Sequence, residues 1–491
     1  MSEIAPPPDG SRDSLDRSLI RGIAWTGSAK WGSQIVTWAS TILVARMLLP
    51  EHYGIVGMAT IYLGLVTLVN EFGFGMAIVA LRDLSDRQVA QLNTVAILFG
   101  LISLGLSFAA APLLALFFQT PELRTVVIAM SLGFVLGSFR TVPQALLQRE
   151  LRFPRLAVIE GIQAVLRALT MIALAAAGFG YWTLVVGNVL GALYWTGLTL
   201  HSRRHSYAAP RWGEIRPALR YSWHILGGRI GWYVYSHADF AVAGRMLGQA
   251  ALGAYSFAWT LASLPVEKVT AMVGRVTPAV FSAVQEDDES LRRYLSNLTE
   301  GLALITFPAA VGLALVADTL VPVALGDRWL AAVAPLRLLA VYASFRSIVT
   351  LLPQILNVTG HSRFGMGNAF LAAVVLPIAF IIGARYGTTG IAAAWIVAHP
   401  LVTLPVYWRV FTRIGMPTSR YLRALWPAIS AVALMATVVL AVKRIEPAGW
   451  PAAARLAVEA GSGAAAYALA IGIIHRSRFK AIRSSLRLLR R

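Results

Sequence analysis

The sequence predicts an all-α polytopic membrane protein. Three observations carry this prediction: the composition, a series of long apolar stretches, and basic residues that recur in every second connection between them. Of the 491 residues, 57% are hydrophobic and 13% are charged, and the mean hydropathy is +0.65. A water-soluble domain cannot cover its surface with so few charged side chains. Most of the chain is therefore expected to lie in lipid.

The apolar stretches are long enough to cross a bilayer, because a transmembrane helix needs about 20 mostly apolar residues. They run over residues 22–46, 55–80, 93–118, 125–147, 156–178, 181–200, 221–245, 251–280, 298–323, 330–356, 366–384, 387–408, 424–442 and 453–474. We therefore expect about fourteen transmembrane helices.

Basic residues test this division, since Lys and Arg gather in cytosolic loops. Arginines cluster around residues 82–87, 149–155, 201–220 and 409–423, whereas the connections that alternate with these hold few. This alternation predicts that both termini are cytosolic. Residues 1–20 are polar and lack the apolar core of a signal peptide, so we expect a disordered cytosolic tail there.

The last residues, 476–491, combine many basic side chains with apolar residues at spacings of three and four, namely Phe479, Ile482, Leu486 and Leu489. This pattern predicts an interfacial helix on an anionic leaflet, with membrane lipids as its partner. The formal net charge of +20 does not indicate nucleic acid, because no basic domain stands apart from the apolar stretches.

Other chemistries are excluded or left without support. The chain has no cysteine, so it forms no disulfide and no thiolate metal site. It has no GxxxxGK[ST] loop for nucleotide phosphates, and no cofactor is expected. No connection is long enough to fold as a soluble domain, which places any function inside the helical bundle or at its mouths.

A repeat links the two halves of the chain. Moving the first stretch by 199 positions brings Ala-Arg-Met-Leu at 45–48 onto Gly-Arg-Met-Leu at 244–247. The same shift brings Gly54 onto Gly253, Gly32 onto Gly231 and Lys30 onto Arg229.

A second window repeats in the fourth stretch of each half. Ser138-Phe139-Arg140 is followed by Pro-Gln and then Arg-Phe, and Ser344-Phe345-Arg346 is followed by the same pairs in the same order. An even number of spans in each unit preserves orientation, so the repeat is expected to be parallel, about an axis along the membrane normal.

The repeat divides the chain. We predict a six-helix lobe at 21–200, a cytosolic linker at 201–220, a second six-helix lobe at 221–409 and two additional helices at 410–475. Two pseudo-symmetric lobes around a central cavity are typical of a transporter that exposes the cavity to each side in turn.

The chain resembles the polysaccharide-transporter branch of the MOP superfamily, the Wzx-type flippases. The resemblance rests on LVARMLLPEHYGIVGMA with EFGFGMAI, on PQALLQRELRFPRLAVIEG, and on VAGRMLGQAALGAYSFAW in the second half. It implies a protein that is no enzyme and that moves an oligosaccharide on undecaprenyl pyrophosphate from the cytosolic to the periplasmic leaflet of the bacterial inner membrane. It also implies a role in exopolysaccharide, capsule or O-antigen synthesis, ion coupling, and partners among polymerase and export proteins.

Four cations inside the predicted spans are candidates for binding an anionic cargo: Lys30, Arg229, Arg140 and Arg346. Lys30 and Arg229 lie roughly 12 Å from the cytosolic starts of their spans, and the two others about 10 Å from the cytosolic ends. A charge at such depth is costly and marks a functional site by default. The alternative is that these cations cap helices or pair with internal carboxylates such as Glu71.

Other charged residues carry weaker indications. Arg46 and Arg245 repeat near the periplasmic ends, where a structural role is favoured. In the fifth stretch, Glu160, Gln163 and Arg167 follow helical spacing and predict one polar face, with Arg167 directed into the bundle.

Ion coupling needs a group in the membrane that titrates or binds an ion. The candidates are Glu71, His237 and Asp239, followed by Glu267 and His399. Asp239 is expected to be hydrated near the outer end of its span, and each lone histidine is expected to be simply hydrogen-bonded.

Aromatic residues of the first and seventh stretches are candidates for stacking on sugars: Trp31, Trp38, Trp232 and Tyr233. The alternative is the aromatic belt of a membrane protein together with helix packing.

Two other classes of protein stay open. A multidrug exporter of the MATE type would share the two-lobe fold, but its cationic substrates favour internal carboxylates. A membrane glycan polymerase or ligase would need catalytic groups on a sizeable periplasmic loop, which the sequence lacks.

Overall fold

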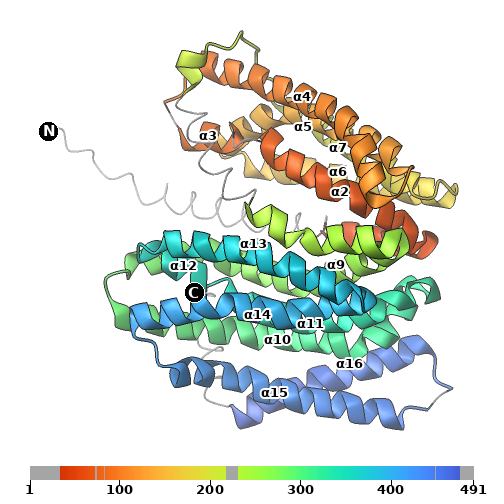
Figure 1. Ribbon diagram of the computed structural model, residues 1–491, viewed down its shortest axis with the longest axis vertical. Helices are drawn as coiled ribbons and strands as arrows, with labels where there is room; N and C mark the ends of the chain where they lie inside the picture. Colours follow the sequence, from red (N-terminus) through yellow and green to blue (C-terminus); the bar gives the residue numbers. More distant parts are fainter. Residues whose placement is uncertain are drawn as a thin grey trace, which may run out of the picture. The chain divides into compact units, whose positions relative to one another are not determined.

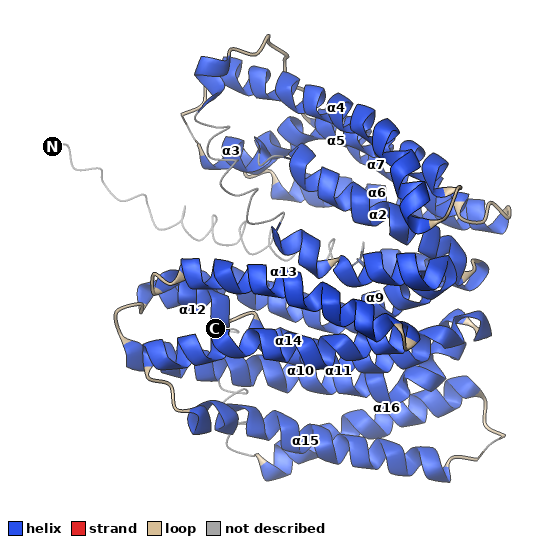
Figure 2. Ribbon diagram, in the orientation of Figure 1, coloured by secondary structure: helices blue, strands red, loops and turns tan. Residues whose placement is uncertain are grey.

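The computed structural model covers the chain and describes residues 32, 34–71, 74–81, 83–216, 231–447 and 449–475. Over these residues the secondary structure is helical, with short connections and no strand (Figure 2). The prediction of an all-α protein is confirmed.

The described chain packs as two units. The first holds the chain as far as Leu48 and again from Met58, and the second holds Leu49–Gly57 together with the chain from Gly231. Helix α2 (Pro50–Glu71) therefore begins in the second unit and continues into the first (Figure 1).

The helices of each unit follow one another in the order of the chain. After the helical residues 34–47, the first unit contains α3 (Phe74–Ala80), α4 (Asp86–Phe118), α5 (Leu123–Arg149), α6 (Phe153–Ala176) and α7 (Trp182–Ser202). The second unit contains α9 (Ala238–Ala283), α10 (Asp288–Leu325), η1 (Asp327–Ala332), α11 (Val333–Val349), α12 (Leu352–Val358), α13 (Ser362–Ala384), α14 (Gly387–Ile414), α15 (Thr418–Ile445), α16 (Ala452–Leu469) and η2 (Ala470–Ile474).

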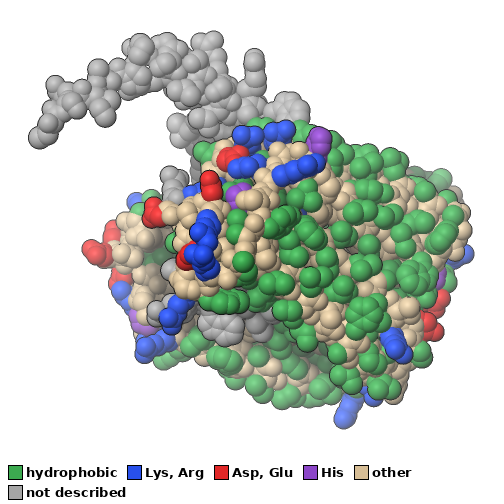
Figure 3. All heavy atoms as spheres, turned by 90° about the horizontal axis from the view of Figure 1, so that it is seen from above, with side chains coloured by type: hydrophobic (Ala, Val, Ile, Leu, Met, Phe, Trp, Pro, Cys, Tyr) green, Lys and Arg blue, Asp and Glu red, His purple; other side chains and the backbone are tan. Residues whose placement is uncertain are grey.

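Ten of the described helices are long and apolar enough to cross a membrane. Their outward side chains are apolar: on α4, Leu101, Ile102, Leu106 and Phe108 are each about half exposed. Figure 3 shows a face covered largely by hydrophobic side chains, with Lys and Arg gathered mainly toward its margins. Such a surface suits hydrocarbon, and the chain is a multi-pass membrane protein.

Several helices begin before the apolar stretches that mark them in the sequence, because polar residues cap their first turns. Helix α4 starts at Asp86 rather than near 93. Ser85 and Gln88 form a reciprocal capping box at this start. Helix α10 starts at Asp288 rather than near 298. The Asp287 carboxylate caps this start by accepting hydrogen bonds from the backbone N–H groups of Glu289 and Ser290. Such caps satisfy backbone donors that have no partner inside the helix.

The loop expected between residues 245 and 251 is a break inside α9. Gly248 adopts φ 82° and ψ −177°, a conformation that a residue with a Cβ rarely adopts, and the helix resumes directly after it.

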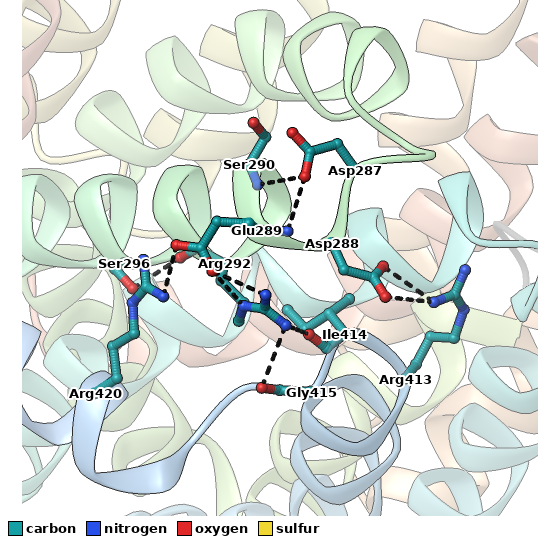
Figure 4. Close-up of polar contacts among 10 residues, drawn as sticks. All are labelled: Asp287, Asp288, Glu289, Ser290, Arg292, Ser296, Arg413, Ile414, Gly415 and Arg420. Atoms are coloured by element: carbon teal, nitrogen blue, oxygen red, sulfur yellow. Dashed lines mark hydrogen bonds and ion pairs between the residues drawn. The ribbon is translucent and has the colours of Figure 1, made fainter.

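Arginines of the second unit also hold helix ends together (Figure 4). Arg413 pairs with Asp288 at 3.1 Å, and Arg420 and Arg292 pair with Glu289 at 2.9 Å and 2.8 Å. Arg292 also donates to the carbonyl oxygen of Ile414, at 2.6 Å, at the end of α14. These contacts join the ends of α10, α14 and α15.

Polar contacts tie α15 and α16 to α10. Glu459 on α16 is fully buried and accepts a hydrogen bond from Thr319 at 2.8 Å. Lys443 on α15 lies 2.5 Å from Asp318 and 3.5 Å from Glu459.

The repeat predicted from Gly54 and Gly253 has a direct structural counterpart. A Cβ on Gly54 would lie 1.7 Å from the carbonyl oxygen of Gln249, and a Cβ on Gly253 would lie 1.7 Å from that of Pro50. Because the 199-position shift also relates Pro50 to Gln249, the two contacts are the same contact made twice. Only glycine permits so close a crossing of two helices.

We predict that Gly253→Ala destabilises the protein, because the added methyl group would meet backbone rather than a movable side chain. Overpacking of this kind costs about 1–3 kcal/mol or more, so the Tm of the detergent-solubilised protein should fall by several degrees. Gly274→Ala is the matched control, since it lies on the same helix and a Cβ there would meet nothing within 4 Å. Equal Tm values for the two variants would contradict the close crossing.

Candidate functional site

Two arginines matched by the repeat each lie over an indole ring. The guanidinium carbon of Arg140, on α5, is 3.8 Å from the centroid of Trp195 on α7. That of Arg346, on α11, is 5.2 Å from the centroid of Trp259 on α9. Stacking on an aromatic face stabilises a cation by about 0.5–2 kcal/mol and keeps its charge in the bundle.

In the first unit Arg140 lines a cavity of about 350 Å³ between α2, α5 and α7. The polar and small residues of its wall are Thr60, Gly64, Thr67, Gly133, Gly137, Thr141 and Asn188. A Cβ on Gly133 or Gly137 would meet nothing within 4 Å, so these glycines open onto space. The cavity therefore combines a cation with hydroxyl groups and an amide.

The predicted polar face of the fifth stretch lies behind this cavity. Arg167 on α6 donates to the side-chain oxygen of Asn188 at 2.7 Å. Gln163 lies one turn earlier, with its amide nitrogen 3.5 Å from the carbonyl oxygen of Gly191. The prediction that Arg167 points into the bundle is confirmed, and its contact holds Asn188 in the cavity wall.

In the second unit Arg346 is held by a carboxylate. It donates to the Ser263 hydroxyl at 3.0 Å and lies 3.4 Å from a carboxylate oxygen of Glu267. The alternative of pairing with an internal carboxylate thus describes Arg346, with Glu267 as the partner in place of Glu71.

A buried carboxylate lies in the same unit. Asp239 is fully buried and accepts hydrogen bonds from the Tyr255 hydroxyl at 2.7 Å, the Trp395 ring N–H at 2.9 Å and the Phe240 backbone N–H at 2.9 Å. The prediction of a hydrated Asp239 was wrong. Position along the span suggested water, but α9 and α14 cover this residue with aromatic side chains.

An aromatic cluster surrounds this carboxylate. The Trp395 ring lies 5.0 Å from Tyr342 and 5.4 Å from Trp259, measured between centroids. His399 contacts Tyr342 edge to face, and among the described residues its Nδ1 is buried without a hydrogen-bond partner. The expectation of a simply hydrogen-bonded histidine is therefore not met at Nδ1 of His399.

For four of the remaining candidate site residues, the structure does not describe the side chain. Lys30, Trp31 and Arg229 lie outside the described residues. Glu71 is the last residue of α2, and its side chain also lies outside what the structure describes.

The other aromatic candidates have separate surroundings. Trp232 is 55% exposed, whereas Tyr233 is buried and stacks on His237 with centroids 3.9 Å apart. His237 is hydrogen-bonded as expected, with Nδ1 3.1 Å from the Ser236 hydroxyl and from the Tyr233 carbonyl oxygen. Trp38 is half-buried, and its ring nitrogen has no hydrogen-bond partner in the described part of the chain.

Sequence reasoning missed the partners of the charged groups. Trp195 and Trp259 come from non-equivalent helices, so the repeat gives no signal for them. Asn188 and Trp395 lie in apolar stretches, far along the chain from the charges they contact.

The repeated helical bundle with charged groups held inside it defines a transporter fold. The model of the polysaccharide biosynthesis protein family matches residues 43–334, more than half of the chain. The chain belongs to this family, which confirms the resemblance to polysaccharide transporters.

Relatives agree over most of the length. The chain is 23% identical to the lipopolysaccharide biosynthesis protein WzxC of Escherichia coli over 84% of the chain and 85% of WzxC. It is 28% identical to the succinoglycan biosynthesis transport protein ExoT of Rhizobium meliloti, over 86% of each. Among solved structures, the lipid II flippase MurJ matches with a TM-score of 0.73 and 15% identity, over 92% of the chain and 99% of MurJ. This last match shows a shared fold.

We predict that Asp239→Ala lowers the Tm of the purified protein, because it leaves the two buried side-chain donors, those of Tyr255 and Trp395, without an acceptor. Each unsatisfied donor costs about 1–3 kcal/mol. Adding Tyr255→Phe removes one of these donors and should restore part of the loss. The loss of Tm in the double variant should therefore be smaller than the sum of the losses in the two single variants. Strictly additive losses would contradict the hydrogen bond from Tyr255 to Asp239.

Proposed function

We propose that this protein is a flippase, which moves an oligosaccharide linked to undecaprenyl pyrophosphate from the cytosolic to the periplasmic leaflet of the bacterial inner membrane. The product would serve exopolysaccharide, capsule or O-antigen synthesis. The observation that carries the proposal is a cavity lined by a cation, hydroxyl groups and an amide inside the helical bundle of a polysaccharide biosynthesis protein. The names of WzxC, ExoT and MurJ support the same class of cargo.

The chemistry of the cargo explains why a cation is needed. A pyrophosphate and a sugar chain lose their hydration when they enter a low-dielectric bundle, at a cost of several kcal/mol or more. A guanidinium offsets part of this cost through charge-assisted hydrogen bonds. Arg140 is the proposed cation of the described chain, and Lys30 and Arg229 are proposed from the sequence.

The protein acts by alternating access rather than by chemical catalysis. Its two repeats would expose the binding site first to the cytosol and then to the periplasm. Both termini would lie in the cytosol, and polymerase and export proteins would receive the product.

We further propose that Asp239 couples transport to a proton. Its oxygens accept from O–H and N–H donors, and the Trp395 ring N–H cannot ligate a metal ion. Loss or gain of a proton on this buried carboxylate would change how strongly Tyr255, in the second part of α9, and Trp395, on α14, are held to the first part of α9, which gives the proton a structural effect.

Deletion of the gene tests the proposed function. We expect loss of surface polysaccharide together with accumulation of the lipid-linked oligosaccharide in the inner membrane, because synthesis continues while translocation stops. Re-expression of the wild-type protein should restore both. Normal polysaccharide combined with increased sensitivity to cationic drugs would instead favour a multidrug exporter.

If Asp239 couples transport to a proton, Asp239→Asn should abolish the stimulation of transport by a pH gradient that is acidic on the periplasmic side. Cargo binding should be kept. Asparagine cannot titrate, but it keeps an acceptor for Tyr255 or Trp395. The measurement is transport in proteoliposomes under imposed proton or sodium gradients. Stimulation by sodium alone, unchanged in the variant, would contradict the role of Asp239.

A further inference from the structure

The first unit's cavity can be compared position by position with the second unit, because the register of the repeat is fixed at two places. For α2 and the second part of α9, the reciprocal contact of Gly54 and Gly253 fixes the 199-position shift. The burial classes also agree at every position when residues 54–59 are set against 253–258. For α5 and α11, Ser-Phe-Arg at 138–140 and 344–346 fixes a shift of 206 positions.

Four residues of the cavity wall on α2 and α5 are replaced by larger ones in the second unit. Leu63 and Phe134 correspond instead to the smaller Ala262 and Ala340, which are both buried. On α2, Thr60 corresponds to Trp259 and Gly64 corresponds to Ser263. On α5, Gly133 corresponds to Leu339 and Gly137 corresponds to Ala343.

These larger side chains fill the corresponding place in the second unit. Leu339 is 1% exposed and Ala343 is 2% exposed, and Ala343 packs with Val266 and Ala310. The Trp259 ring lies under the guanidinium of Arg346, and Ser263 accepts its hydrogen bond. The second copy has the contacts of a packed core, whereas the first copy has open space beside Arg140.

The chemistry of the open copy suits a sugar diphosphate. The Arg140 guanidinium offers N–H donors to phosphate oxygens. Thr67 and Thr141 donate their hydroxyl hydrogens to the backbone of their own helices, at 2.7 Å and 3.1 Å, which leaves their oxygens to accept from sugar hydroxyls. A volume of about 350 Å³ lies within the roughly 300–1,000 Å³ of small-molecule sites.

We propose that the diphosphate and first sugar of the cargo bind in the first unit, in the cavity beside Arg140, and that the second unit's copy of this site is closed by Trp259 and serves packing. This inference rests on the proposed function, since it assigns the cargo's charged end to one repeat. It makes the two pseudo-symmetric halves unequal partners in transport.

The test measures binding of undecaprenyl pyrophosphate to the purified full-length protein in detergent, with neutral undecaprenol as the reference for binding of the lipid tail. Gly137→Leu fills the cavity from a position with open space, and Arg140→Gln removes the charge. Each should weaken undecaprenyl pyrophosphate binding by about tenfold or more, the effect of losing one charge-assisted hydrogen bond, and leave undecaprenol binding unchanged.

Two variants serve as controls. Gly105→Leu places the same side chain at an exposed glycine of α4 with nothing within 4 Å, so it should bind as the wild type does. Arg346→Gln combined with Glu267→Gln removes the second unit's ion pair without leaving a lone charge. The affinity for undecaprenyl pyrophosphate should change by less than about threefold, which is the range for loss of a partly exposed ion pair. The Tm of each variant without lipid establishes that it is folded.

Three outcomes are decisive. Loss of binding in Gly137→Leu and Arg140→Gln, but not in the controls, supports the inference. Tight binding by Gly137→Leu, or loss confined to the Arg346 and Glu267 double variant, overturns it while the proposed function stands. Failure of the wild-type protein to bind undecaprenyl pyrophosphate overturns the proposed function as well.

Discussion

The hydrocarbon of the bilayer is the constraint on which the rest of this structure depends. It offers no hydrogen-bond partners, so every backbone group must be satisfied within the chain, and helices satisfy this requirement segment by segment. The same solvent requires each internal charge to be held by the protein. Arg346 lies against Glu267, Asp239 accepts three donors, and Glu459 is bonded to Thr319. These three groups each have an identifiable partner in the part of the chain that the structure describes.

The internal repeat shows which features of the bundle the two halves share and which they do not. The close crossing at Gly54 and Gly253 keeps its reciprocal geometry, because any larger residue would separate the helices. Away from this crossing the copies have diverged. One has small residues around Arg140 and an open cavity, and the other has Trp259 and a packed core around Arg346. The shared crossing belongs to the scaffold, and the proposed site lies where the two copies differ.

Much of the fold was predictable from the sequence, because hydrophobicity and glycine spacing act locally. The helical class and the repeat came from such patterns. The burial of Asp239 and the pairing of Arg346 with Glu267 did not, because they depend on which helix faces which. The cavity was also beyond prediction, since Gly133 and Gly137 are ordinary small residues of an apolar stretch until α2 and α7 are placed beside them.

Translocation itself provides the most direct measurement of the central claim, that the protein flips a lipid-linked oligosaccharide through a site containing Arg140. A fluorescent undecaprenyl-pyrophosphate-linked oligosaccharide in proteoliposomes, with the fluorophore on the glycan, can be bleached from outside by a membrane-impermeant reductant. We predict that the wild-type protein moves labelled lipid from the inner to the outer leaflet, so that nearly all of the fluorescence is bleached. With Arg140→Gln, only the outer-leaflet half should be bleached. Bleaching by Arg140→Gln at the wild-type rate, or only half bleaching with the wild-type protein, would contradict the claim.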